Sequence, residues 1–184
     1  MTRIAVVYHS GYGHTQRMAQ AVAEGANAEL VAIDADGNLP PGGWEDLKAS
    51  DAIIFGSPTY MGDVSWQFKK FADASSKPWY AQAWKDKVAA GFTNSGGMSG
   101  DKLNTLHTIM TLANQHGMIW VSLGLMPSNL KSSKRDDVNY LVSYTGAMAA
   151  SPTDGGAADM SAGDLETARL LGARVAEITA RLYP

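Results

Sequence analysis

The chain has 184 residues, of which 45% are hydrophobic and 18% charged, a composition that suits one folded domain over residues 1–184 and excludes a disordered chain. Its net charge of −3 disfavours binding to nucleic acid or to a membrane surface, which requires a basic face. Cysteine is absent, which excludes disulfides and thiolate chemistry, and no bilayer-spanning run or signal-peptide pattern is present, which predicts a cytoplasmic protein.

Short apolar runs alternate along the chain with segments of helical periodicity. In chain order, strands are expected at residues 4–8, 29–34, 52–56, 88–92 and 118–123. Helices are expected at residues 16–26, 44–49, 64–72, 101–116 and 161–182. This alternation is typical of an α/β fold with a parallel sheet.

Two segments outside these elements carry further expectations. Residues 127–162 are polar and rich in glycine, proline and serine, and they are too many for a plain connection, which favours a functional loop or lid. Ser161 and Asp164 have the spacing of a capping box at the start of the last helix.

The loop Ser10–Thr15 lies between the first strand and the first helix. Its glycines, hydroxyl groups and backbone amides at a helix start indicate a phosphate site. It lacks the Gly-Lys-Ser/Thr ending of a nucleoside-triphosphate loop, so a terminal monophosphate is favoured. Gly11-x-Gly13, with Asp34 further on, also begins a dinucleotide fingerprint, although Gln16 replaces its third glycine, and an ordinary tight turn remains an alternative.

Two further loops, at residues 57–63 and 93–100, follow the third and fourth expected strands. In open parallel sheets the ligand binds beyond the carboxyl ends of the strands, so these loops are expected to meet the phosphate loop there. Each alone also matches a solvated turn. Together they describe a phosphate site beside a slot for a flat heteroaromatic ring, which points to flavin mononucleotide (FMN).

Three motifs carry a resemblance to a known family. They are Tyr8-x-Ser10-x-Tyr12-Gly13-His14-Thr15, the run Asp51–Thr59, and His116-Gly117-Met118. The chain resembles the flavodoxin superfamily, and within it the WrbA-like NAD(P)H:quinone oxidoreductases. The resemblance implies a flavodoxin-like, three-layer, doubly wound sheet of five parallel strands in the order 2-1-3-4-5, and it implies bound FMN.

The resemblance also assigns residues. It places the FMN phosphate on Ser10, Gly11, Tyr12, Gly13, His14 and Thr15, and the ring and ribityl chain on Pro58, Thr59, Tyr60, Thr93, Asn94, Ser95, Gly96 and Gly97. Tyr12 and Trp79 match positions where nicotinamide or quinone stacks on the flavin. The chain departs from the family at Tyr60-Met61, where Arg-Phe is usual, and at Gln115, which replaces a histidine.

The expected activity is the FMN-dependent transfer of two electrons from NADH or NADPH to a quinone or similar small acceptor, with the protein as a homodimer or homotetramer. No acid–base residue is obligatory because the chemistry belongs to FMN, and backbone amides of residues 93–97 are the candidate donors to the anionic reduced ring. A flavodoxin-type electron carrier and a flavin-free nucleotide-binding module remain alternatives. His9, His14, His107 and His116 lack ligand spacing, so no metal site is expected, and His116 is interpreted as a helix-end residue bonded to backbone carbonyls.

Overall fold

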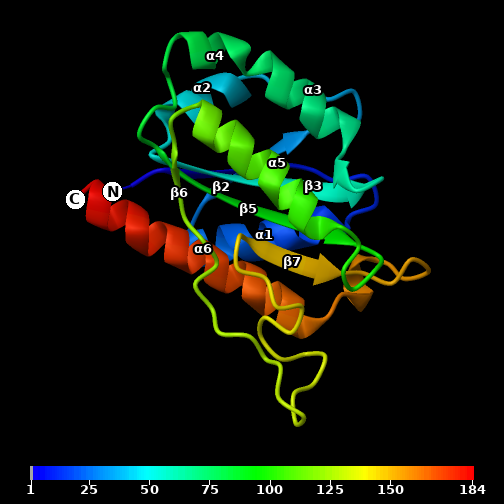
Figure 1. Ribbon diagram of the computed structural model, residues 1–184. Coiled ribbons are helices and arrows are strands. Elements are labelled where there is room, and N and C mark those ends of the chain that lie inside the picture. Colours follow the sequence, from blue (N-terminus) through cyan, green and yellow to red (C-terminus); the bar gives the residue numbers. More distant parts are fainter. Residues whose placement is uncertain (1) are drawn as a thin grey trace.

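The computed structural model describes residues 2–184 and shows a mostly parallel sheet between two layers of helices (Figure 1). Its strands are β1 (Ile4–His9), β2 (Glu29–Ile33), β3 (Ala52–Tyr60), β4 (Asp63–Val64), β5 (Val88–Ser95), β6 (Ile119–Trp120) and β7 (Ala147–Ala150). The main path of the sheet is β2-β1-β3-β5-β6, with β4 antiparallel to β3 and β7 parallel to β5. Counted over the five strands expected from the sequence, this is the order 2-1-3-4-5, which confirms the predicted fold class.

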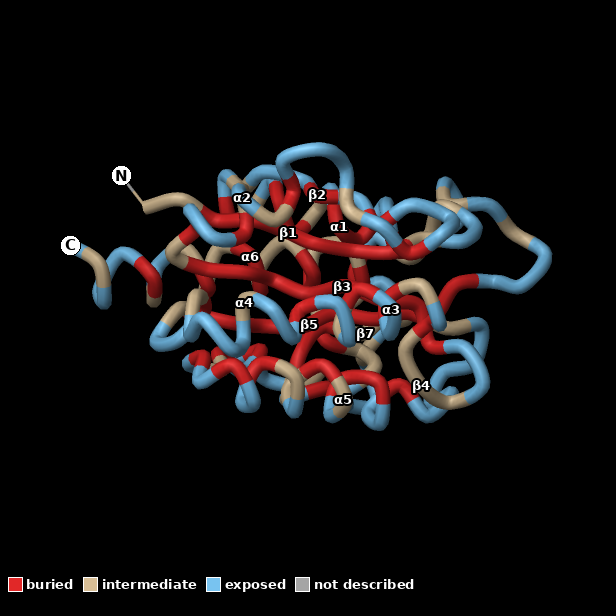
Figure 2. The backbone as a smooth tube through the Cα atoms, turned by 90° about the horizontal axis from the view of Figure 1, so that it is seen from above, coloured by how far each residue is buried: buried red, intermediate tan, exposed pale blue. Residues whose placement is uncertain are grey.

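Helices cover both faces of the sheet. They are α1 (His14–Ala26), α2 (Gly43–Ala49), α3 (Trp66–Ala74), α4 (Ser76–Tyr80), α5 (Lys102–Gln115) and α6 (Ala162–Leu182), with a short 3₁₀ turn at Ala157–Asp159. Alternate residues of β1 enter different cores: Val6 packs with α1 and α6, and Val7 packs with α2, α3 and α5. Figure 2 shows the consequence, since the central strands are the most deeply buried part of the chain.

The fifth position of the sheet is shared by two strands. β6 pairs with Val88 and Ala89 at the start of β5, and β7 pairs with Phe92–Ser95 at its end. The strand expected at residues 118–123 is therefore too long, because the chain leaves the sheet after β6 and the Leu123 amide donates to the Tyr144 carbonyl instead. A strand inside residues 127–162 was not expected, and it takes the place that β6 vacates.

Backbone packing explains how β7 returns to the sheet. A β-carbon on Gly146 would lie 2.2 Å from the Gly91 carbonyl oxygen, so only glycine permits this close approach of the two backbones. β3 and β5 also extend beyond the expected strands, with Ser57 in register with Thr93 and Pro58 with Asn94. Segments expected as loops therefore belong to the sheet and have fixed positions.

The start of α6 differs from the predicted capping box. Ser161 precedes the helix but makes no side-chain cap bond, and its hydroxyl donates to Asp136 Oδ1 at 2.7 Å. The Asp164 carboxylate accepts from Arg135 Nη1 at 2.8 Å and from the Ala150 amide at 2.9 Å. The prediction was wrong because Asp164 bonds to distant segments and ties β7 to residues 130–140, whereas a capping box would have used the helix's own amides.

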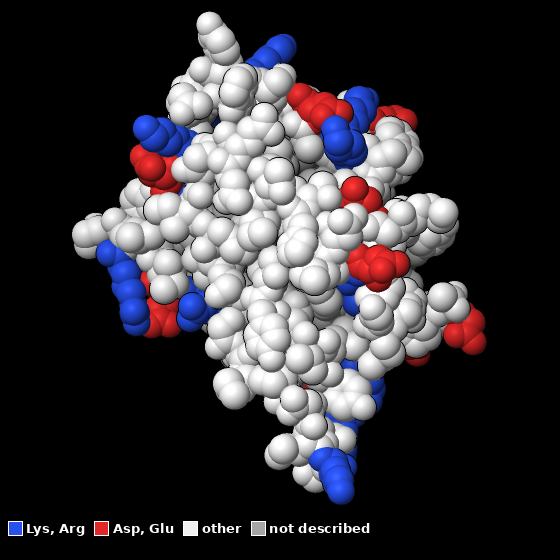
Figure 3. Space-filling view, viewed as in Figure 1, with Lys and Arg blue, Asp and Glu red and all other residues white. Residues whose placement is uncertain are grey.

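The surface of the described chain adds two observations. None of its helices combines the length and apolarity that a membrane crossing requires. On the face shown in Figure 3, basic and acidic side chains lie mainly around the margin, and the central area over α5 carries almost no charge. Within α5, Lys102 is the only Lys, Arg, Asp or Glu, and it is buried.

The backbones of α1 and α6 come into direct contact where the two helices cross. This contact sets the distance between the loops that precede the two helices. A β-carbon on Gly172 would lie 2.0 Å from the Val22 carbonyl oxygen, and one on Gly25 would lie 1.9 Å from the Arg169 carbonyl oxygen. Glycine at both positions therefore lets the helix backbones touch. No larger residue fits unless the helices move apart.

The substitution Gly172→Ala tests this contact. Glycine to alanine inside a helix ordinarily stabilises by about 0.5–1 kcal/mol, whereas here overpacking is expected to lower the free energy of unfolding by about 1–3 kcal/mol. Urea denaturation measures the change. Glu177→Ala, at an exposed position of the same helix, serves as the control and is expected to change stability by less than about 0.5 kcal/mol. A stabilised Gly172→Ala variant would contradict the close crossing.

Candidate functional site

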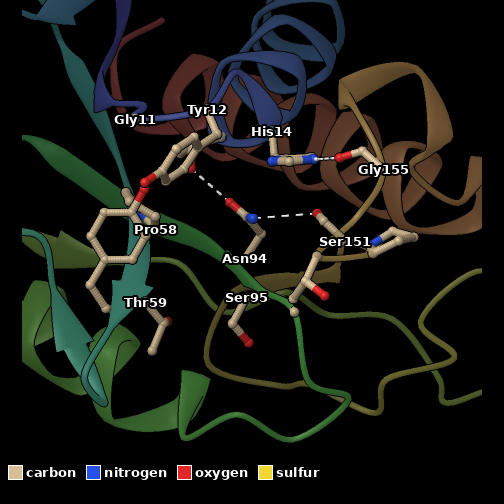
Figure 4. A pocket seen from close by; sticks show the side chains of 14 residues that line it. Gly11, Tyr12, His14, Pro58, Thr59, Asn94, Ser95, Ser151 and Gly155 are labelled. Atoms are coloured by element: carbon tan, nitrogen blue, oxygen red, sulfur yellow. Dashed lines mark hydrogen bonds between the residues drawn. The ribbon is translucent and has the colours of Figure 1, made fainter.

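A cavity of about 470 Å³ opens at the carboxyl edge of the sheet, within the usual size range of small-molecule sites (Figure 4). Four segments form it: the loop after β1, the end of β3, the end of β5 and the segment after β7. Its lining residues are Gly11, Tyr12, His14, Thr15, Pro58, Thr59, Tyr60, Asn94, Ser95, Gly96, Ser151, Pro152, Thr153 and Gly155. None of these is Lys, Arg, Asp or Glu, so the wall offers hydroxyl, amide and aromatic groups.

The loop after β1 is held by Ser10. Its Oγ accepts from the amides of Gly13 and Gln16, each at 3.1 Å. Gly13 lies at the N-cap of α1 with φ of 90°, in the left-handed region that favours glycine, and it has no side chain with which to cap the helix. The next amides, those of His14 and Thr15, have no partner within the helix and are therefore available to an anion.

A chain of hydrogen bonds joins three of the four segments. Thr15 Oγ1 donates to Asn94 Oδ1 at 2.7 Å, and Asn94 Nδ2 donates to Ser151 Oγ at 3.3 Å (Figure 4). His14 adds a further link across the cavity, since its Nε2 donates to the Gly155 carbonyl at 3.2 Å. These bonds fix the loop after β1 against the segment that follows β7.

Buried hydroxyl groups support the end of β3 from behind. Thr59 Oγ1 lies 2.8 Å from both Thr93 Oγ1 and Thr105 Oγ1. Nearby, Ser65 Oγ lies 2.8 Å from His9 Nδ1, and burial lowers the pKa of His9 below its usual value, which keeps the imidazole neutral. Hydrogen bonds between buried side chains therefore hold the end of β3 in place from the side away from the cavity.

Two tyrosines lie at the mouth of the cavity. The ring centroids of Tyr12 and Tyr60 are 6.4 Å apart in an edge-to-face contact, and Tyr12 is 81% exposed. A β-carbon on Gly11 would lie 2.5 Å from the Tyr60 hydroxyl oxygen, so glycine allows the phenol to approach the loop. Burial raises the pKa of Tyr60, which keeps its hydroxyl protonated as a donor.

The structure brings most of the residues predicted for the cofactor around this one cavity. Ser10, Gly13, Thr93 and Gly97 do not line it: Ser10 and Gly13 shape the first loop, and Thr93 supports Thr59. The sequence interpretation missed the lining residues after β7, which are Ser151, Pro152, Thr153 and Gly155. The glycine- and proline-rich composition of residues 127–162 was the signal for a functional segment there. Because strand β7 was not expected, the sequence did not indicate that the residues after it reach the cavity.

Trp79 lies away from the cavity. α3 begins near the carboxyl edge of the sheet and runs back, so α4 and Trp79 lie at the opposite edge (Figure 1). There the Trp79 indole Nε1 donates to the Gln115 carbonyl at 3.0 Å. Within one chain, Trp79 therefore does not lie beside Tyr12 at the cavity, and its part in stacking stays a prediction.

His116 also has a different environment from the one expected. Its Nε2 pairs with Ser75 Oγ at 2.8 Å, in place of a backbone carbonyl, and its ring centroid lies 4.2 Å from that of Trp84. Among residues 2–184 no group bonds to its buried Nδ1. Burial lowers the pKa of His116 to about 4, so the side chain is a neutral core residue.

Comparisons with known proteins agree with this architecture. A family described as NADPH-dependent FMN reductase matches residues 44–129. A protein of Pseudomonas aeruginosa named flavodoxin FldP is 54% identical over the whole of both chains. An NAD(P)H dehydrogenase (quinone) of Paracoccus denitrificans is 33% identical, over 99% of this chain and 96% of its own. A solved flavodoxin, WrbA-like protein from Agrobacterium tumefaciens is 57% identical with a TM-score of 0.83, over 98% of this chain and 99% of its own.

The sheet order and the cavity at its carboxyl edge define a flavodoxin-like, doubly wound α/β protein. With the identities above, the chain belongs to the flavodoxin superfamily and, within it, to the WrbA-like proteins. The resemblance read from three short motifs is confirmed.

His116 makes the stability of the fold depend on pH. Between pH 6.5 and about 4 the unfolded chain binds a proton at this position and the folded chain does not, so stability is expected to fall as the pH falls through this range. His116→Phe removes this part of the acid sensitivity, as measured by urea denaturation at several pH values. The exposed His107, replaced by Gln, is the control and is expected to leave the profile unchanged. An identical profile in His116→Phe would contradict the assignment.

Proposed function

We propose that this chain binds FMN in the cavity and transfers two electrons from NADH or NADPH to a quinone-type acceptor. One observation carries the proposal. Backbone amides without a partner in the helix lie at one end of the cavity, and an uncharged, partly aromatic slot lies at the other end. The names of the matching family and of the Paracoccus denitrificans relative support the same activity.

The amino-terminal end of α1 suits the phosphate of FMN. The free amides of His14 and Thr15 point from the positive end of the helix dipole, which is equivalent to roughly half a unit charge. The Thr15 hydroxyl already donates its hydrogen to Asn94 Oδ1, so Thr15 Oγ1 can accept further hydrogen bonds but has no hydrogen left to donate. Backbone amides are therefore the main phosphate donors in this proposal, with the neutral Ser10 hydroxyl behind them.

The ends of β3 and β5 suit the ring. Pro58, Thr59 and Tyr60 form one wall, and Asn94, Ser95 and Gly96 form the facing one. A β-carbon on Gly96 would lie 2.5 Å from Thr153 Cγ2, so glycine lets the segment after β7 close against this wall. The flat slot that results holds a heteroaromatic ring by stacking and by backbone bonds to its polar edge.

The residues of this chain bind, orient and expose the cofactor. When bound, FMN supplies the capacity to accept and donate two electrons. The exposed Tyr12 at the mouth, and the full exposure of Met61 next to Tyr60 in the chain, leave room for a second flat molecule over the ring. Because the cofactor carries the chemistry, no side chain of the cavity is needed to move a proton, and the His14 Nε2 hydrogen serves to bond the Gly155 carbonyl.

A flavodoxin-type electron carrier is the second candidate function. The 54% identity to a protein named flavodoxin FldP favours it. In this case the exposed mouth would meet a partner protein in place of a quinone. The two functions share the same FMN site and differ only in what donates and accepts the electrons.

Reconstitution with FMN tests the proposal. The purified chain is expected to take up FMN with a shift in its visible spectrum, to lose that absorbance when NADH or NADPH is added without oxygen, and to regain it with benzoquinone. Steady consumption of NAD(P)H with benzoquinone supports the reductase. Bound FMN that only a separate reductase protein can reduce supports the carrier. A chain that binds NAD and no FMN would contradict both.

Asn94 provides a second test, because its amide joins Thr15 to Ser151. Asn94→Ala removes two bonds worth about 1 kcal/mol each, so the affinity for FMN is expected to fall roughly tenfold or more. Fluorescence titration of FMN measures the change. Asn114→Ala, at an exposed position of α5, is the matched control and should bind like the original chain. Equal affinity in both variants would show that this network does not shape the site.

A further inference from the structure

Lys102 is the first residue of α5 and has no exposed surface. A buried ammonium group is costly unless other groups compensate it. The outer face of α5 in Figure 3 lacks charge because the single charged residue of the helix points inward. The sequence interpretation gave this lysine no role, and the network at the cavity does not include it.

The position of the Lys102 ammonium links it to the cavity. Nζ donates to Ser95 Oγ at 2.9 Å and to the Gly97 carbonyl. Ser95 lines the cavity, so the positive charge lies one side chain behind the wall. Because Ser95 Oγ accepts from Nζ, its own hydrogen is free to turn from the Gly97 carbonyl, 3.3 Å away, toward an acceptor in the cavity.

The charged groups near Lys102 do not neutralise its positive charge. Asp164, which is 3% exposed at its side chain, is already paired with Arg135 through both carboxylate oxygens. Asp164 raises the pKa of Lys102 and Arg135 lowers it, while burial has the largest effect and lowers the pKa to about 8. Lys102 is still mainly protonated at neutral pH, and the three groups together carry one net positive charge.

We propose that Lys102 is a positioning residue that supplies positive charge behind residues 95–97 and thereby favours the anionic, reduced form of the isoalloxazine ring. This inference rests on the proposed binding of FMN. A fixed cation in a poorly solvated wall stabilises negative charge in the cavity more than water would. The reduced cofactor then binds more tightly relative to the oxidised one, and its reduction potential rises.

A purely structural role makes a different prediction. If Lys102 only holds the turn at residues 95–97, its loss weakens the fold and the binding of oxidised and reduced FMN alike. The ratio of the two affinities, and hence the potential, then stays constant. The midpoint potential of bound FMN is therefore the measurement that separates the two roles.

The experiment compares the original chain with Lys102→Met and Lys87→Met at pH 7. Methionine retains most of the apolar length of lysine and removes its charge. Lys87 is the matched control, since its half-buried ammonium donates to the carbonyls of Lys48, at 2.8 Å, and Ser50, and burial likewise lowers its pKa. It directly precedes β5, at the opposite edge of the sheet from the cavity.

In Lys102→Met, the affinity for reduced relative to oxidised FMN is expected to fall at least tenfold, which for two electrons lowers the potential by about 30 mV. Lys87→Met is expected to keep the original potential. An unchanged potential in Lys102→Met, or an equal fall in both variants, overturns the proposal. Failure of the original chain to bind FMN overturns the proposed function and this inference together, whereas binding with an unchanged potential overturns only the role of Lys102.

Two further variants apply if Lys102→Met does not fold, as judged by thermal melting. Lys102→Arg keeps the charge and is expected to keep the potential. Asp164→Asn removes the neighbouring negative charge and is expected to shift the potential upward at pH 6, where Lys102 stays protonated although the loss of Asp164 lowers its pKa. A potential that falls in Lys102→Arg, or that does not rise in Asp164→Asn, overturns the proposal.

Discussion

The parallel pairing of β5 with β3 on one side and β7 on the other is the constraint on which the site depends. Pro58 is in register with Asn94, and Ser95 is in register with Ala150, so three segments that are far apart in the sequence end side by side. Ladder hydrogen bonds hold each end in place. The cavity is therefore built on two strand ends and one helix start, and hydrogen bonds hold the loop after β1 against the segment after β7.

The polar network of the site follows from this pairing. Thr15, Asn94 and Ser151 bond to one another because the first helix, the end of β5 and the segment after β7 converge at one edge. All three side chains are nearly or fully buried, so each needs a partner inside the protein. A wall made of amides and hydroxyl groups suits a flat ring with polar edges and a phosphate bound by backbone amides, which agrees with the chemistry of FMN.

Charge enters the site indirectly. The cavity wall carries no Lys or Arg, and the Lys102 ammonium lies behind Ser95, where it donates to a hydroxyl group and a carbonyl. The ion pair of Arg135 with Asp164 lies beside it and also binds the β7 backbone at Ala150. The same buried cluster thus fastens the inserted strand and, under the proposal for Lys102, would also place positive charge behind the ring, which would connect the architecture of the fifth sheet position with the proposed redox chemistry.

The sequence by itself determined the α/β fold class and the loop at residues 10–15, because apolar periodicity and a glycine-bearing turn before a helix are local signals. The strand order was implied by the resemblance to the flavodoxin superfamily. The sequence also brought Pro58, Thr59 and Asn94 into one hypothesis, since strand ends of a parallel sheet share an edge. Only the tertiary structure decided that β7 completes the sheet, that Gly155 reaches His14, that Trp79 lies at the other edge, and that Lys102 points inward. These features arise from pairings between distant segments, such as Gly146 against Gly91, and no local pattern of residues records such contacts.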